Sequence, residues 1–134
     1  MAILQQALEK LEHFALAPTA SRNTNLDGTA VDLKDYDGDV VLILDSAAGA
    51  TSTCTVTLQD SADNVTFANI TAAFTRDGVL QPSGTVSFAQ QGTGASKQTL
   101  VLNKDGIRRY VKAVSTEAGT HVYSVNGVGV KKYG

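Results

Sequence analysis

The segment Asp35-Tyr36-Asp37-Gly38-Asp39 is the first part of the chain whose residue types could do chemistry. Closely spaced carboxylates can hold a hard cation such as Ca²⁺. The spacing does not fit an EF-hand loop, because Gly38 comes too early in it and Ser46 stands where that loop needs a bidentate glutamate. An acidic turn that leads into a strand explains the segment more simply. Asp60, Asp63 and Asn64 form a second cluster of this kind, and we interpret it in the same way.

The histidines and the cysteine are the next candidates, as ligands of a transition metal. His13 and His121 lie near opposite ends of the chain, and Cys54 is the one cysteine. A zinc site needs about four protein ligands, or three and a water molecule. We therefore expect no metal ion, and we expect Cys54 to be a small buried apolar residue.

Motifs of enzyme active sites are missing from the sequence. It contains no GxSxG nucleophile elbow, no P-loop and no dinucleotide fingerprint. Gly92 and Gly94 fall in an expected loop between strands, which is a poor position for a phosphate cradle. We predict a non-enzymatic protein with no catalytic residues and no cofactor.

Positive charge gathers near the C-terminus, where Arg108 and Arg109 precede Tyr110 and Lys112. A basic strip beside a strand edge could contact an acidic surface of a partner protein. The alternative is that these are ordinary solvated side chains that protect an edge against aggregation. Arg108 and Arg109 are therefore candidate partner-binding residues.

Composition limits the classes of function. The 134 residues carry a net charge of −2, and only 18% of them are charged. Without a basic surplus, binding of nucleic acid is not expected. No run reaches the roughly 18 apolar residues that span a bilayer, and the N-terminus lacks the pattern of a signal peptide. We expect a soluble protein that is made in a reducing cytoplasm.

An amphipathic pattern near the N-terminus predicts a helix that ends before Pro18. Its apolar stripe is Ile3, Leu4, Ala7, Leu8, Leu11, Phe14 and Ala15. A helix of this length is marginal alone, so its stripe must lie on the chain's own β domain or on another subunit. We predict that it docks on a neighbouring subunit. Ile3, Leu4, Leu8 and Leu11 are the candidate contacts. Residues 1–26 would form this helix and a polar connecting arm, and residues 27–134 a β-sandwich domain.

From Thr29 onward the pattern becomes that of β-strands. We count about eight short strands, which is typical of an antiparallel, jelly-roll-like β-sandwich. Residues 40–44 and 53–59 would form one hairpin, and residues 107–116 and 121–130 the last one. The side chains expected to point inward are Val41, Ile43, Cys54, Val56, Leu58, Val111, Ala113 and Val125.

Two stretches resemble small structural proteins of tailed bacteriophages. The first runs from Asp37 through the apolar strand to the pattern Leu58-Gln59-x-Ser61-x-Asp63-x-x-x-Phe67, and the second is the strand at 107–114, with Arg109-Tyr110-Val111. The group that these stretches resemble includes head decoration, or cement, proteins. The resemblance spans residues 37–116 and consists of strands and turns rather than a catalytic signature.

This resemblance implies a virion protein that decorates and stabilises a phage head by binding the lattice of the major capsid protein. Such proteins are commonly homotrimers. The loops at 46–52 and 90–96, rich in glycine, serine and threonine, would contact the capsid together with the N-terminal arm. The alternatives are a tail or fibre component and a carbohydrate-binding β-sandwich, although the chain has no tryptophan for a sugar platform.

Overall fold

The computed structural model describes residues 11–47, 53–103 and 106–131. The described residues form strands and loops without an α-helix, and none of them belongs to a helix that could cross a membrane. The strands are β1 Leu11–Arg22, β2 Val31–Asp32, β3 Tyr36–Ser46, β4 Cys54–Ser61, β5 Ala68–Asn69, β6 Phe74–Arg76, β7 Val79–Gln81, β8 Ser96–Asn103, β9 Tyr110–Glu117 and β10 His121–Lys131.

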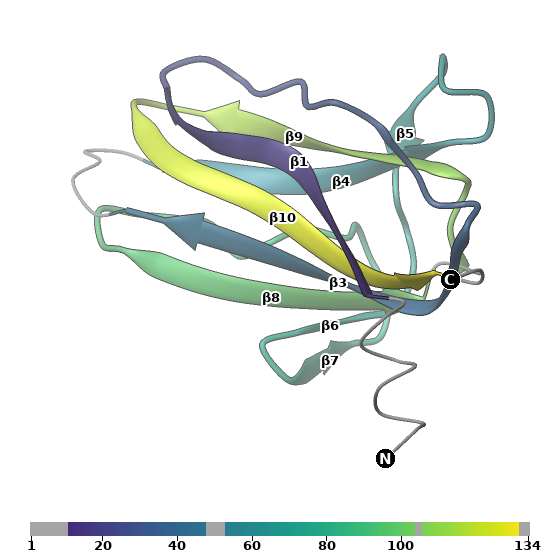
Figure 1. Ribbon diagram of the computed structural model, residues 1–134. Helices are drawn as coiled ribbons and strands as arrows, with labels where there is room; N and C mark the ends of the chain where they lie inside the picture. The colour runs from purple at the N-terminus through teal and green to yellow at the C-terminus, as the bar shows by residue number, and fades with distance from the viewer. Residues whose placement is uncertain (1–10, 48–52, 104–105, 132–134) are drawn as a thin grey trace.

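Two antiparallel sheets pack face to face, as Figure 1 shows. One is six-stranded, in the order β1-β10-β3-β8-β6-β7, and the other is four-stranded, in the order β2-β9-β4-β5. The predicted antiparallel sandwich is therefore confirmed. The core lies between the sheets, where alternate residues of β3, β4, β8, β9 and β10 point inward.

Alternation predicted the inward face correctly on three strands. Cys54, Val56 and Leu58 are buried on β4, Val111 and Ala113 on β9, and Val125 on β10. On β3 the prediction was wrong, because Val40, Leu42 and Leu44 are buried while Val41 and Ile43 are partly exposed. All five residues at 40–44 are apolar, so the run gave no indication of which alternate set faces the core.

The predicted N-terminal helix is wrong for the residues from Leu11 on, which form strand β1, and residues 1–10 lie outside the described part. β1 pairs antiparallel with β10 from Leu11 to Arg22, so the expected end of the helix and most of the connecting arm belong to the six-stranded sheet. Pro18 falls at a register shift between Ala17 and Ala20. A proline is tolerated there, because β1 is an edge strand.

Glycines in β10 explain why the N-terminal segment pairs as a strand. Phe14 lies opposite Gly127, and a Cβ atom built on Gly127 would come within 2.2 Å of the Phe14 ring. The ring occupies that space and meets Tyr36 of β3 edge-on, with ring centroids 5.5 Å apart. This aromatic packing and the β1–β10 ladder outweigh a helix that is marginal on its own.

Both predicted hairpins are also wrong. β3 pairs with β10 and β8, whereas β4 pairs with β9 and β5, so residues 40–44 and 53–59 belong to different sheets. The strands of the other predicted hairpin, β9 and β10, also belong to different sheets. Each connection arches from one sheet to the other, and local sequence does not distinguish such an arch from a hairpin turn.

A hairpin within one sheet occurs at β6–β7. Arg76 pairs with Val79 across the two-residue turn Asp77-Gly78, in which both residues have positive φ, 50° and 83°. This is the geometry of a type I′ turn, for which Asp-Gly is a preferred sequence. The turn is fixed to β8, since Asp77 Oδ1 accepts a 2.8 Å hydrogen bond from the Thr99 amide.

Candidate functional site

The predicted partner-binding residues lie in different parts of the molecule. Ile3, Leu4 and Leu8 are outside the described residues. Leu11 begins β1 and is 45% exposed. Arg108 and Arg109 precede β9, and their guanidinium groups are bound to carboxylates of the same chain.

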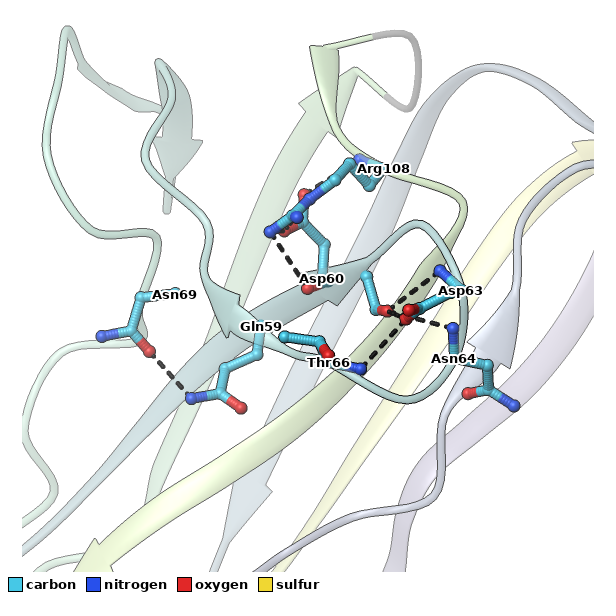
Figure 2. A network of polar contacts seen from close by, with 8 residues as sticks. Gln59, Asp60, Asp63, Asn64, Thr66, Asn69 and Arg108 are labelled. Carbon is cyan, nitrogen blue, oxygen red and sulfur yellow. Dashed lines mark hydrogen bonds and ion pairs between the residues drawn. The ribbon is translucent and has the colours of Figure 1, made fainter.

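Arg108 holds the buried end of β4 in place. Its Nε and Nη2 atoms donate to Asp60 Oδ1 at 3.0 and 2.8 Å, and its backbone amide donates to Asp60 Oδ2 at 2.9 Å. The Asp60 side chain is only 8% exposed, whereas that of Arg108 is 48% exposed. Figure 2 shows the guanidinium reaching over Asp60. The pair links the loop before β9 to the end of β4.

Arg109 forms a second ion pair, nearer to solvent. Nε and Nη2 donate to the two carboxylate oxygens of Asp32 at 2.9 and 2.7 Å, which is the bidentate arrangement that arginine favours. The guanidinium also stacks on the Tyr110 ring at 4.9 Å. The Arg109 hydrogen bonds lower the pKa of Asp32. A role of Arg108 and Arg109 in partner binding stays a prediction.

The acidic cluster around Asp63 lies in a turn that is held by hydrogen bonds to the Asp63 side chain. Asp63 Oδ1 accepts hydrogen bonds from the Thr66 amide at 3.0 Å, drawn in Figure 2, and from the Ser61 hydroxyl at 2.8 Å. The Val65 amide donates to the same oxygen at 2.9 Å. The two backbone bonds, Thr66 first, lower the pKa of Asp63 to about 2. With Asp60 bound to Arg108, the carboxylates of this cluster have partners within the chain. Asp35, Asp37 and Asp39 of the other cluster are exposed.

A buried cluster of Cys54, Glu117 and His121 lies at one end of the sandwich. Cys54 begins β4 and is paired in register with Glu117, the last residue of β9. His121 begins β10 in the opposite sheet, and its Nδ1 contacts Glu117 Oε1. One ligand atom from each residue lies within 4.8 Å of the other two. Among the described residues, this is the one group of three or more such side chains close enough to share a metal ion.

Polar atoms in this end of the core are shielded from water. The side chains of Glu117 and His121 are both 0% exposed, and Cys54 is 1% exposed. Glu117 Oε1 contacts His121 and accepts from the Gly119 amide, whereas Oε2 is buried without a hydrogen-bond partner. Burial, followed by the neighbouring Glu117, raises the pKa of the Cys54 thiol to about 12.

More buried polar atoms come from Gln91 and Tyr123. The Gln91 backbone exchanges two hydrogen bonds with that of Cys54, at 2.8 and 3.1 Å. Gln91 is 2% exposed, and both atoms of its side-chain amide lack a hydrogen-bond partner. Tyr123 Oη is buried without a hydrogen-bond partner as well. An unpaired buried polar group costs about 1–3 kcal/mol.

This cluster was not predicted from the sequence, because Glu117 fell in the expected turn between residues 107–116 and 121–130, and Cys54 lies far from it along the chain. The pattern that could have indicated the cluster is the alternation of inward and outward residues along β9 and β10. The inward face of β9 continues from Val111 and Ala113 through Ser115 to Glu117, and that of β10 runs back from Val125 through Tyr123 to His121. A hairpin of β9 and β10 would place both strands in one sheet. In the structure they belong to different sheets, so Glu117 and His121 face each other across the core.

The β6–β7 hairpin exposes the most prominent apolar side chains on a sheet edge. Val79 is 62% and Leu80 is 65% exposed, and both belong to β7, which ends the six-stranded sheet. Figure 1 shows the hairpin extending beyond β8. In the loop before β8, Gln91 is buried while Gly92 to Ala95 are exposed. Contact of this loop with the capsid stays a prediction.

Comparison with known proteins gives a likeness of fold. No protein-family model matches the sequence, and a search of curated proteins finds no match. The structure is similar to the crystal structure of the SPBc2 prophage-derived protein YomS, with a TM-score of 0.60. The likeness covers 90% of this chain and 93% of YomS at 12% sequence identity. At this identity the comparison shows that the two chains share a fold.

Proposed function

We propose that the chain is a non-catalytic structural protein of a tailed-phage particle. It acts by binding neighbouring protein subunits. The β-sandwich supplies a rigid body, and its exposed edge supplies the contact. The observation that carries the proposal is the apolar edge at Val79 and Leu80, in a fold shared with a prophage-derived protein.

An exposed apolar pair on an edge strand suits a protein contact. Full burial of a valine or leucine side chain contributes about 1.5–3 kcal/mol, so covering both residues supplies a useful part of a modest interface. β7 has three residues, and Pro82 follows it directly. So short an edge is a poor template for further strands, and this favours side-chain packing against a partner over extension of the sheet.

The finer proposal is that the chain decorates the head and stabilises it. Support comes from the resemblance of residues 37–116 to small structural proteins of tailed bacteriophages, a group that includes head decoration proteins. The partner would be the major capsid protein, and the chain would be a homotrimer on the outer head surface. Weak contacts suffice there, because each linked site raises the effective concentration for the next one.

Localisation on purified particles tests this proposal. Particles from the phage that encodes the chain would be imaged by electron cryo-microscopy beside particles that lack its gene. We expect density to be lost from the outer head surface, and we expect the deleted heads to rupture at lower temperature or under milder osmotic shock.

Two results would overturn parts of the proposal. Loss of density from the tail would replace head decoration by a role as a tail component. Absence of the chain from purified particles would overturn the structural role itself.

A further inference from the structure

We propose that Cys54, Glu117 and His121 form a binding site for a transition-metal ion, with Zn²⁺ as the best-fitting ion. The ion would join the two sheets at one end of the core. The inference concerns the interior of the sandwich, so it does not depend on where the protein acts.

The three residues supply a donor set that suits zinc. Thiolate sulfur, imidazole nitrogen and carboxylate oxygen are its usual protein ligands, with bonds of about 2.0–2.3 Å. Tetrahedral coordination with such bonds places the donor atoms about 3.5 Å apart. One donor atom from each residue already lies within 4.8 Å of the others. Binding would require side-chain rotations that bring the donor atoms to this spacing and separate His121 Nδ1 from Glu117 Oε1.

The unpartnered carboxylate oxygen is the second observation that points to a cation. Glu117 Oε2 is buried without a hydrogen-bond partner, in a side chain that is 0% exposed. Oε1 of the same carboxylate contacts His121 and the Gly119 amide, so Oε2 is the oxygen whose burial without a partner is costly. A cation between Glu117, Cys54 and His121 would satisfy this oxygen. Binding would release the proton of the Cys54 thiol, since the thiolate is the form that binds metal.

A bound ion would act as a cross-link. Cys54 and Glu117 belong to β4 and β9 of the four-stranded sheet, whereas His121 belongs to β10 of the six-stranded sheet. The ion would close the arch between β9 and β10, in a chain whose single cysteine rules out an internal disulfide. With three protein ligands, a water molecule would complete the coordination.

Cobalt provides a direct spectroscopic test with the full chain. Metal-free protein would receive Co²⁺ both in the folded state and during refolding from urea, because the site is enclosed. We expect one ion per chain, the intense visible bands of tetrahedral Co²⁺ and a thiolate-to-cobalt charge-transfer band. That band can come only from Cys54, the one cysteine in the sequence. The charge-transfer band is measured on the native chain, so this test does not depend on a variant that folds.

Zinc then tests the role in stability. Zn²⁺ should displace Co²⁺ and raise the Tm of the native chain, with a rise that grows with free Zn²⁺. Cys54→Ser and His121→Gln should abolish this rise and the cobalt bands. His13→Gln is the matched control, since it removes the only other histidine, an exposed one on β1. It should bind as the native chain does.

The proposal would be overturned if the native chain binds neither ion saturably after refolding. It would also be overturned if the cobalt complex lacks the thiolate band. Loss of binding in His13→Gln, with retention in His121→Gln, would assign the metal to the surface instead. If Cys54→Ser does not fold, the thiolate band of the native chain decides alone.

Discussion

At the scale of single residues, the neighbouring Arg108 and Arg109 differ in the burial of their partners. The Asp60 side chain is 8% exposed and that of Asp32 is 34% exposed. Arg108→Ala removes the guanidinium from a buried carboxylate, which should cost about 1–3 kcal/mol of unfolding free energy. Arg109→Ala removes a solvent-screened pair, which should cost about 0–1 kcal/mol. Urea unfolding of the two variants would measure the difference, and equal losses would contradict this account.

Asp63 gives a prediction about pH. Its pKa is lowered from 3.8 to about 2, because the amides of Thr66 and Val65 donate to the charged carboxylate. The stability that the carboxylate contributes is therefore present above the unfolded value near 4, and it is lost as the pH falls through about 2. NMR titration of the side-chain carboxyl should give a midpoint near 2. A midpoint near 4 would mean that the turn does not hold the ionised form.

At the scale of elements, alternation predicted strand positions but not strand partners. It placed Cys54, Val56 and Leu58 on the inward face correctly, because apolar and polar residues alternate strictly there. It failed at 40–44, where every residue is apolar. Strand pairing depends on contacts between segments that are far apart in the sequence. The residues of a turn therefore do not indicate which strands pair.

The N-terminal segment shows how tertiary contacts override a local pattern. Leu11, Phe14 and Ala15 fit a helical stripe, yet they lie in β1 against β10. The feature that favours the strand is Gly127, more than a hundred residues away, whose missing side chain leaves room for the Phe14 ring. A helical period within one short window cannot include that information.

Gly127→Ala tests this explanation. Its Cβ would come within 2.2 Å of the Phe14 ring and 3.0 Å of Leu42, so the ring must move away from Tyr36. Overpacking of this kind costs about 1–3 kcal/mol. Gly94→Ala is the control, because a Cβ there meets nothing within 4 Å. Thermal unfolding should show a lower Tm for Gly127→Ala alone, and similar Tm values for both variants would refute the packing argument.

At the scale of the whole molecule, the buried polar cluster results from the arrangement of the two sheets. Cys54, Glu117 and His121 come together because β4 and β9 pair in one sheet while β10 crosses to the other. Alternation along β4, β9 and β10 is enough to place all three residues on inward faces. It does not indicate that the chain crosses from one sheet to the other between β9 and β10, and this crossing sets Glu117 against His121 across the core.

The proposed role in a phage particle also belongs to this scale, because it depends on what the exposed edge of the six-stranded sheet contacts. Val79 and Leu80 project from the terminal strand of the six-stranded sheet. Val65 is more exposed still, at 80%, but it lies in the turn after β4 and not on that edge. Substitutions at Val79 and Leu80 therefore remove apolar surface from the sheet edge, and a substitution at Val65 removes it elsewhere.

Binding of the purified chain to phage heads that lack it is the most direct measurement of the central claim. We predict that the native chain binds saturably and raises the temperature at which the heads rupture. The double variant Val79→Ser/Leu80→Ser should bind about tenfold more weakly or worse, because a loss of 1.4 kcal/mol weakens binding tenfold, while Val65→Ser should bind as the native chain does. No binding to heads, or equal binding by the double variant, would contradict the account.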